Sequence, residues 1–331
     1  MSTSVGASDF GVGSVAVIGA GMAGLACARV VHAAGLRVTV FERAPAIGGR
    51  IATRRIGGFA FDHGAQYVRV RDENFGAYVN FAEETGAVAP WRPCAKAAAD
   101  NYHAEWLVGT PGMQSLVLPL AAGLDVRCRA SICELSRDSH DHWFVHTNTD
   151  QIVGPFEAVA VAIPAPQAIE LLEKLPPLGA SLESVVMAPC WSAMVALAEP
   201  LGTWPDLVMP DHGPIAWAAR ESSKPSRNLD SDRWVLHATP EWTRQNLDEQ
   251  QQWIGQDLLV ELARLSGALP PVKYLSAYCW KFARVIRPLG ETCLWDAGQR
   301  IGACGDWCID ARVEAAWQSG TALGNAIASE L

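Results

Sequence analysis

A glycine-rich turn near the start of the chain has the residue types and the spacing to bind a dinucleotide. The apolar, β-branched run Val15–Ile18 is followed by Gly19-Ala20-Gly21-Met22-Ala23-Gly24, a GxGxxG sequence. In such a turn the first glycine permits the bend, the second lets a pyrophosphate approach bare backbone, and the third lets the following helix pack close to the strand. The helix N-terminus offers free N–H groups to the phosphates. We therefore predict that residues 19–24 bind a dinucleotide.

The residues after this turn support the same interpretation. Apolar side chains recur at helical spacing up to Gly35, and Arg37–Phe41 then alternates as a second strand that ends at Glu42. Glu42 lies 23 residues after Gly19, near the place where an acidic residue accepts hydrogen bonds from an adenosine ribose. An ordinary glycine-rich turn is the alternative, but strand, helix and acid in register favour dinucleotide binding.

A second candidate phosphate contact follows in residues 43–50. Arg43 is followed by Gly48-Gly49-Arg50, so the loop can approach a phosphate closely and a guanidinium can neutralise it. Flavoproteins of the glutathione-reductase-like superfamily commonly have this second contact, and that resemblance favours FAD over NAD. A surface turn that contains an arginine by chance is the alternative.

Two further stretches have a composition that suits a flavin. In Asp62-His63-Gly64-Ala65-Gln66-Tyr67 the strand alternation breaks at a glycine, and small, amide and aromatic side chains suit contacts to a flat heterocycle; a bulged strand end is the alternative. Near the C-terminus an apolar strand leads to Gly305-Asp306, and a helix is predicted from about Arg312. Its N-terminus would favour negative charge on a bound ring. The three stretches 19–50, 62–67 and 305–314 together indicate a flavin site more specifically than any one of them does.

Composition limits the class of protein. Half of the 331 residues are hydrophobic and 18% are charged, which allows a large core, and the net charge of −9 argues against nucleic-acid or anionic-membrane partners. No run approaches the roughly 18 apolar residues of a membrane span. The first dozen residues resemble a loose tail without a secretory signal. With nine cysteines, an odd number, we expect reduced thiols and a cytoplasmic protein.

Other candidate chemistry is weaker. Cys304 and Cys308 fit no zinc spacing, and His140, His142 and His146 are typical of a solvated hairpin tip, so we predict no metal site. Seven of the thirteen tryptophans lie between Trp191 and Trp280, which indicates either an aromatic core or an apolar box over a flat substrate.

Four residues are candidates for a substrate pocket. These candidate catalytic residues are Gln66, His237, Trp280 and Arg284. Hydride transfer needs no strong nucleophile or metal, only a flat apolar slot and polar groups that orient the substrate. For His237, within a strand-like run, a hydrogen-bonded core histidine is the more common role.

The chain resembles the bacterial branch of the renalase family, in the flavin amine-oxidase-like superfamily. The resemblance covers most of the chain and rests on these motifs: GAGMAG at 19–24, GGR at 48–50, DHGAQY at 62–67, GTPGM at 109–113, WAARESSKPSR at 217–227, WKFAR at 280–284 and CGDWCIDARVEAAWQSG at 304–320. One residue departs from the pattern. Glu221 stands where relatives usually have asparagine, which puts any substrate contact at that position in doubt.

The resemblance implies an α/β fold with a Rossmann-like FAD-binding domain and a second α+β substrate domain that contains a mixed antiparallel sheet. The expected FAD-binding domain comprises residues 1–70, 107–175 and 290–331, and the expected substrate domain residues 71–106 and 176–289. Within these we predict helices over 71–86, 114–122 and 246–265, and a buried strand over 156–163.

The resemblance also implies the cofactor and the reaction. FAD, bound non-covalently, would contact Gly19, Ala20, Gly21, Met22, Ala23, Gly24, Glu42, Arg43, Gly49, Arg50, Ala65, Gln66, Tyr67, Ile132, Asp306 and Val313. Renalase-like enzymes transfer a hydride from 2- and 6-dihydro isomers of NAD(P) to flavin N5, and oxygen accepts the electrons to give hydrogen peroxide and NAD(P)+. A flavin-containing amine oxidase, a flavin-dependent desaturase or isomerase that consumes no oxygen, and a flavin-binding regulatory module are the alternatives.

Overall fold

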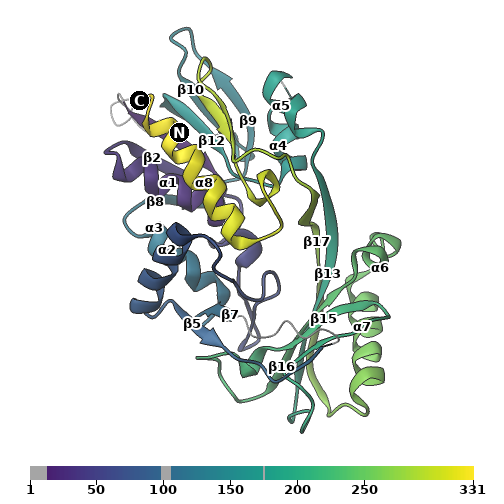
Figure 1. The fold of residues 1–331 in the computed structure, drawn as a ribbon. Helices are drawn as coiled ribbons and strands as arrows, with labels where there is room; N and C mark the ends of the chain where they lie inside the picture. The colour runs from purple at the N-terminus through teal and green to yellow at the C-terminus, as the bar shows by residue number, and fades with distance from the viewer. Residues whose placement is uncertain (1–12, 98–105, 174–175) are drawn as a thin grey trace, which may run out of the picture. The chain divides into compact units, whose positions relative to one another are not determined.

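The computed structural model describes residues 13–97, 106–173 and 176–331, which form two compact units (Figure 1). Unit 1 comprises residues up to 49, 117–187 and 285–331, and unit 2 comprises residues 50–116 and 188–284. The chain therefore enters unit 2 twice. The expected tail at residues 1–12, and residues 98–105 of the expected substrate domain, lie outside the described residues.

The boundaries of the units differ from the expected domain boundaries. Residues 50–70 and 107–116, expected with the nucleotide-binding domain, belong to unit 2, and residues 176–187 and 285–289 belong to unit 1. The reason is packing. Phe61, at the end of a short hairpin, is fully buried against Met194 and Val235 of the sheet of unit 2. The side chains of Phe59 and Phe61 thus have their apolar partners in unit 2 rather than in the sheet of unit 1.

Unit 1 is built on a six-stranded sheet with the order β18-β19-β12-β1-β2-β8. Its pairings are parallel except for the antiparallel pair β18–β19. Every residue of β1 is buried, as expected for a strand covered on both faces. The Rossmann-like fold and the two predicted strands that flank the glycine turn are therefore confirmed. The strands are β1 (Ser14–Ile18), β2 (Arg37–Glu42), β8 (Asp125–Cys128), β12 (Ala158–Val161), β18 (Leu294–Asp296) and β19 (Ile301–Ala303).

Two helices pack face to face in unit 1, α1 (Met22–Ala33) and α8 (Val313–Ala328) (Figure 1). Small residues allow the close approach. A Cβ at Gly320 of α8 would lie 2.0 Å from the carbonyl oxygen of Ala23, and one at Gly324 would lie 2.8 Å from Cβ of Val30. The helix predicted from about Arg312 is confirmed, and its residue Gly320 lies against Ala23, near the start of α1.

The rest of unit 1 is a three-stranded antiparallel sheet with short helices. The strand predicted over 156–163 is two strands, because the chain turns at Glu157 between β11 and β12. The helix predicted over 114–122 is a 3-10 turn followed by one helical turn that starts beside Pro119, a residue tolerated only in a first turn. These elements are β9 (Ile132–Arg137), β10 (Trp143–Thr147), β11 (Ile152–Phe156), the 3-10 turn Met113–Val117, α3 (Leu118–Ala121), α4 (Ala165–Leu171) and α5 (Pro176–Leu182).

Unit 2 is built on a six-stranded sheet with the order β17-β13-β16-β15-β14-β6. Pairs β13–β16, β16–β15 and β15–β14 are antiparallel and β14–β6 is parallel. This confirms a second domain with a mixed, largely antiparallel sheet. The strands are β6 (Ala95–Ala97), β13 (Val186–Leu197), β14 (Leu207–Met209), β15 (Ile215–Arg220), β16 (Asp232–Ala238) and β17 (Val272–Arg287).

Helices and hairpins complete unit 2. The predicted amphipathic helix is α2 (Glu73–Glu84), capped by Asp72, whose side chain accepts a hydrogen bond from the backbone N–H of Phe75. The helix predicted over 246–265 begins later, at Gln251, because a separate short helix precedes it. The remaining elements are β3 (Arg54–Ile56), β4 (Phe59–Phe61), β5 (Val88–Trp91), β7 (Trp106–Gly109), α6 (Pro240–Gln245) and α7 (Gln251–Ser266).

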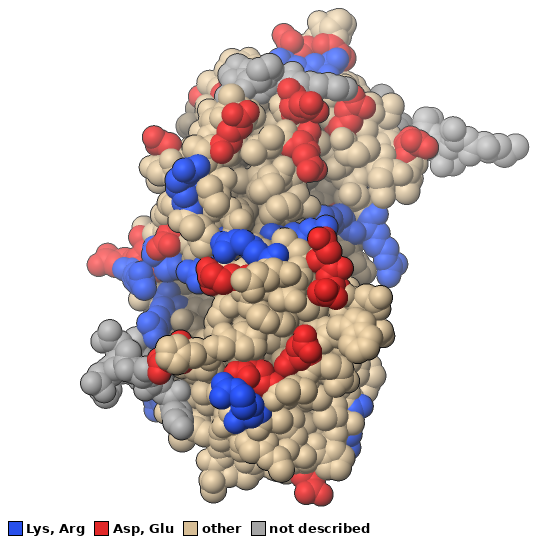
Figure 2. All heavy atoms as spheres, turned by 90° about the vertical axis from the view of Figure 1, so that its right-hand side faces the viewer, with Lys and Arg blue, Asp and Glu red and all other residues tan. Residues whose placement is uncertain are grey.

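The molecular surface mixes both signs of charge. On the face in Figure 2, acidic and basic side chains occur in small groups separated by wide areas of other residues. Within the described parts of the chain, no helix combines the length and the apolar character that crossing a membrane requires.

The glycine contact between α1 and α8 gives a test of the fold. Gly320→Ala should lower the free energy of unfolding by about 1–3 kcal/mol, because the new methyl group overlaps the carbonyl oxygen of Ala23. Asn325→Ala, at an exposed position of the same helix, should leave stability unchanged or raise it slightly. Urea unfolding followed by tryptophan fluorescence measures both. Equal midpoints for the two variants would contradict the described helix packing.

Candidate functional site

The glycines of the GxGxxG turn are required for two different reasons. Gly19 has φ +105°, and a Cβ there would lie 2.5 Å from the carbonyl oxygen of Ala162; at Gly24 it would lie 1.9 Å from the carbonyl oxygen of Gly19. The protein's own packing therefore demands both residues. Gly21 has φ −82°, and a Cβ there would meet only the carbonyl oxygen of Gly48, at 4.0 Å. The space in front of Gly21 is open, as close approach by a pyrophosphate requires.

Glu42 holds the glycine turn in place. Its carboxylate is buried and accepts hydrogen bonds from the backbone N–H groups of Ala20, at 2.9 Å, and Ala44, at 2.8 Å. A carboxylate has about four acceptor positions, so these two bonds leave capacity for the hydroxyl groups of a ribose.

The predicted second phosphate loop lies against the first within unit 1. The N–H of Gly48 donates to the carbonyl oxygen of Ala20 at 2.8 Å. Gly49 has φ +54°, and a Cβ there would lie 3.4 Å from Cα of Gly21. Arg43 is exposed at the start of this loop. Two glycine loops thus share one edge of the sheet, beside the N-terminus of α1.

The C-terminal stretch supplies the third group of predicted residues in unit 1. Asp306 is buried in a 3-10 turn, Asp306–Cys308, and the N–H of Gly305 donates to Oγ of Ser319 in α8 at 3.0 Å. Val313 is the first residue of α8. Ile132, the first residue of β9, is partly buried against a core cluster that includes Phe41.

Cys304 and Cys308, beside the Gly305-Asp306 stretch, were considered as a thiol or metal site. Cys304 and Cys308 are fully buried, and burial raises the pKa of Cys308 to about 12 and that of Cys304 well above its ordinary value. Both therefore stay protonated at neutral pH and are poor nucleophiles. Across residues 13–97, 106–173 and 176–331, no three histidine, cysteine, aspartate or glutamate side chains are grouped to hold a metal ion.

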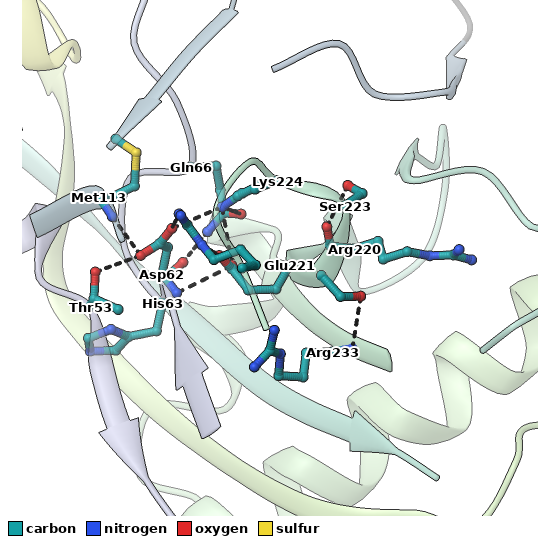
Figure 3. Close-up of polar contacts among 12 residues, drawn as sticks. Thr53, Asp62, His63, Gln66, Met113, Arg220, Glu221, Ser223, Lys224 and Arg233 are labelled. Carbon is teal, nitrogen blue, oxygen red and sulfur yellow. Dashed lines mark hydrogen bonds and ion pairs between the residues drawn. The ribbon is translucent and has the colours of Figure 1, made fainter. Parts of the chain in front are cut away.

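In unit 2 the carboxylate of Asp62, the first residue of the DHGAQY motif, collects four donors (Figure 3). Oδ1 accepts from Oγ1 of Thr53 at 2.7 Å and from the N–H of Met113 at 2.8 Å. Oδ2 accepts from Arg227 at 2.5 Å and from Nζ of Lys224 at 3.4 Å. The side chain of Asp62 is 0% exposed. Three segments that are distant in sequence therefore meet at one carboxylate.

A second carboxylate completes a buried ionic quartet of Asp62, Glu221, Lys224 and Arg227. Glu221 accepts from the N–H of Asp62 at 3.3 Å, from Nζ of Lys224 at 3.2 Å and from Nε of Arg227 at 3.2 Å. No side chain of the quartet is more than 2% exposed. Two anions and two cations balance, which offsets much of the cost of burying them.

The quartet shifts the acidity of its members in opposite directions. Burial favours protonation of Asp62, but Lys224 and Arg227 outweigh it and hold the pKa of Asp62 well below its ordinary value. Burial and the neighbouring Asp62 raise the pKa of Glu221 above its ordinary value. Burial alone would lower the pKa of Arg227, yet the two carboxylates raise it. The guanidinium of Arg227 therefore remains charged.

Sequence reasoning missed the quartet, although it noted the unusual Glu221. That residue is fully buried and held by protein groups. The available signal was the run Glu221-Ser-Ser-Lys224-Pro-Ser-Arg227, in which charges recur every three residues among small polar residues. Nothing in the run itself identifies Asp62, 162 residues from Lys224, as the partner.

Gln66, a predicted flavin contact and pocket residue, is tied into the turn that contains it. Its Nε2 donates to the carbonyl oxygens of Asp62 and, at 3.3 Å, Gly64, and its Oε1 accepts from Nζ of Lys224 at 3.2 Å. Both ends of the amide are engaged within unit 2.

His237 and Trp280, two other predicted pocket residues, converge on the same turn. The carbonyl oxygen of His63 accepts from Nε1 of Trp280 at 2.9 Å and lies 3.3 Å from Nε2 of His237. The ring of His63 packs against those of Trp280 and Tyr278, with centroids 4.8 and 5.3 Å apart. The structure thus brings Gln66, His237 and Trp280 together around residues 62–66.

Arg50, Ala65 and Arg284 lie along the edge of this arrangement. The N–H of Ala65 donates to the carbonyl oxygen of Arg50 at 2.9 Å, and the guanidinium of Arg50 donates to the carbonyl oxygen of Ala283 at 3.3 Å. Arg284, the next residue of β17, is exposed. Of the four predicted pocket residues it is the one for which no contact with the turn is observed.

Tyr67 begins an aromatic stack. Its ring lies parallel to Trp106, with centroids 4.2 Å apart, and 5.5 Å from Trp217. The guanidinium of Arg69 lies 5.5 Å from the ring of Tyr67 and 5.0 Å from that of Trp106. Trp191 and Trp234, by contrast, are buried in the core of unit 2. The tryptophan-rich region therefore supplies both core residues and a separate stack beside the DHGAQY motif.

Comparisons with known proteins agree with this architecture. Residues 17–81 match the NAD(P)-binding Rossmann-like domain. A 72-residue segment, 22% of the chain, is 42% identical to 4,4'-diapophytoene desaturase (4,4'-diaponeurosporene-forming) of Staphylococcus haemolyticus, and it spans only 14% of that enzyme.

Solved structures match over nearly the whole chain. A protein from Exiguobacterium sp. 255-15, provisionally assigned as a protoporphyrinogen oxidase, superposes with a TM-score of 0.78 at 12% identity, over 97% of this chain and all of that one. Cyclohexylamine oxidase from Brevibacterium oxydans gives 0.74 at 12% identity, over 96% and 99% of the two chains. A putrescine oxidase variant gives 0.70 at 13% identity, over 96% and 99%. The chain has the amine oxidase fold. Within this fold, the GxGxxG turn and the DHGAQY turn belong to unit 1 and unit 2 respectively.

The two histidines of the DHGAQY surroundings predict a pH dependence of stability. Burial lowers the pKa values of His63 and His237 from 6.5 to about 4. The unfolded chain therefore binds more protons than the folded one between about pH 6.5 and 4, so the free energy of unfolding falls as the pH is lowered through that window.

His237→Gln should make this fall shallower by about 1–3 kcal/mol, because one of the two groups no longer titrates. His140→Gln, at an exposed position, is the matched control and should keep the original slope. The midpoints of urea unfolding at pH 7 and pH 4.5 measure how much stability each variant loses between these two pH values. An identical slope for both variants would show that His237 titrates normally in the folded protein.

Proposed function

We propose that the protein is an FAD-dependent oxidase of the renalase type, which oxidises 2- and 6-dihydro isomers of NAD(P). The observation that carries the cofactor assignment is the open space at Gly21, with a second glycine loop packed against it and Glu42 beside it. The isomer preference rests on the resemblance of the sequence motifs. The proposal includes a cytoplasmic, reducing setting, which the odd number of cysteines supports.

The residues of the chain fit FAD. The two glycine loops and the N-terminus of α1 offer backbone N–H groups to the pyrophosphate, and Glu42 has acceptor capacity for the adenosine ribose. Ile132 would support the adenine. Asp306 and the first turn of α8, at Val313, would bind the ribityl chain and the pyrimidine edge of the flavin. The predicted contacts of Arg43, Arg50, Ala65, Gln66 and Tyr67 complete the proposed set.

The chain's own residues provide orientation and charge. Bound FAD would supply a two-electron acceptor that takes a hydride from the substrate, and oxygen would then take both electrons to give hydrogen peroxide. The N-terminus of α8 stabilises negative charge placed near it. The stack at Tyr67, Trp106 and Trp217 offers aromatic surface to a flat ring. The sequence contains one GxGxxG turn, so a nicotinamide compound would enter as substrate rather than as a second bound coenzyme.

An amine oxidase is the second candidate, because two of the structures that share the fold are named as amine oxidases. Their identity to this chain, 12–13%, establishes a common fold and leaves the substrate open. The chain has five tyrosines, the last of them Tyr278, so a late tyrosine of an aromatic frame around the flavin would need replacement by a tryptophan.

Gly21→Ala tests the cofactor assignment. The substitution should leave the stability of the apoprotein unchanged, because φ is ordinary and the space is open. It should weaken FAD binding about 10- to 100-fold, since losing charge-assisted backbone contacts costs roughly 1–3 kcal/mol. Gly24→Ala, which overlaps the carbonyl oxygen of Gly19, should lower stability instead. Flavin content and thermal melting separate the two variants; full flavin in Gly21→Ala would rule out this placement.

The reaction is tested by anaerobic rapid mixing. We expect flavin bleaching by 2- or 6-dihydro-NAD(P) and none by benzylamine or a polyamine, followed by peroxide release when oxygen is admitted. Bleaching by the amines alone would establish an amine oxidase, and turnover without oxygen uptake would favour a desaturase or isomerase. Acid precipitation should leave the yellow colour in the supernatant; a yellow pellet would show covalent flavin.

A further inference from the structure

Lys224 contacts both carboxylates of the buried quartet and also the side chain of Gln66 in the DHGAQY turn. Its Nζ lies 3.2 Å from Oε1 of Gln66, 3.4 Å from Oδ2 of Asp62 and 3.2 Å from Oε2 of Glu221. An ammonium group has three donors, and here three acceptors surround it. The side chain is 0% exposed, and its Nζ lies 5.5 Å from the ring of Trp91.

This arrangement determines which way the amide of Gln66 faces. With Oε1 toward the ammonium, the amide hydrogens point to the carbonyl oxygens of Asp62 and Gly64. In the flipped orientation the two amide hydrogens would face the ammonium, donor against donor, and Oε1 would face two carbonyl oxygens. Both changes are unfavourable in a buried site, where the local dielectric constant is low. The charge of Lys224 therefore selects one orientation of the amide.

We propose that Lys224 is a positioning residue, which orients the amide of Gln66 and so fixes the backbone of residues 62–66, the segment that contains the flavin contacts proposed for unit 2. The inference rests on the proposed flavin-dependent function. The same backbone is held from its other side by Trp280 and His237, at the carbonyl oxygen of His63. Lys224 is thus the charged member of a set of groups that fix a single turn.

The energetics of buried charges favour such a role over a purely stabilising one. Buried ion pairs are often matched or exceeded in stability by well-packed apolar residues, and the best-attested gain from retaining them is a unique conformation. Removal of Lys224 would leave Asp62 and Glu221 with Arg227 as their remaining cation, and Gln66 without the group that orients it. The turn would then have more than one accessible arrangement.

Lys224→Met and Lys224→Arg test the inference, with Arg220→Met as the matched control. Arg220 is a partly buried cation of the same unit that is paired with Asp206 and Asp232, at 3.6 and 3.5 Å. We expect Lys224→Met to shift the visible absorption bands of the flavin and to lower kcat about 10- to 100-fold with little change in KM, the scale expected of a misplaced reacting group. Lys224→Arg should restore part of the spectrum and rate. Arg220→Met should lower Tm and leave both unchanged.

A normal flavin spectrum and kcat in Lys224→Met, with a Tm loss like that of Arg220→Met, would overturn the inference and leave Lys224 a purely structural cation. A double-mutant cycle on Tm between Lys224→Met and Gln66→Leu in the apoprotein is independent of any flavin. The inference requires that the two losses of Tm are not additive, and additive losses refute it. A wild-type protein that binds no FAD would refute the proposed function instead, while the cycle still reports whether Lys224 and Gln66 are coupled. If Lys224→Met does not fold, Lys224→Gln, which also removes the charge, and Gln66→Leu carry the same cycle.

Discussion

A carboxylate without access to water is the constraint on which the arrangement of unit 2 depends. Asp62 must keep its negative charge to accept from Thr53, the N–H of Met113 and two cations. These four donors come from three segments of the chain, so satisfying one charge fixes three connections at once. A carboxylate left unpaired in such a place would be strongly destabilising. Because Asp62 is held by these donors, the position of the DHGAQY turn that begins with it is fixed as well.

In unit 1 the packing around the glycine turn is determined by the space available for side chains rather than by charge. Gly19, Gly24 and Gly320 are small because other backbone atoms occupy the volume where their side chains would be. Gly21 is small although a Cβ there would meet only the carbonyl oxygen of Gly48, 4.0 Å away. This contrast within one six-residue motif distinguishes glycines that the packing of the chain requires from a glycine in front of which the space is open.

Much of unit 1 was predictable because its signals are local. A buried strand, a glycine turn, a helix and an acidic residue follow one another within residues 15–42, and each is recognisable from its neighbours in sequence. The quartet was not predictable, because it joins residues near position 62 to residues near position 224, and no local pattern records that pairing. Gln66 is visible in the sequence as part of the DHGAQY motif, whereas its contact with Lys224 is visible only in the structure. The boundaries of the two units differ from the predicted domain boundaries because Phe61 packs against Met194 and Val235, which are distant in sequence.

The packing of α1 against α8 has a consequence for biosynthesis. Helix α1 lacks its packing partner α8 until residues 313–328 have been translated. The segments of unit 2 end at residue 284, so that unit is complete in sequence before unit 1 is. Domains commonly fold as units during synthesis. In unit 1, however, strands β1, β2, β8 and β12 are synthesised before β18, β19 and α8, so the sheet cannot be completed until those later elements have been made. A chain that stops before residue 313 would therefore expose the face of α1 that α8 covers.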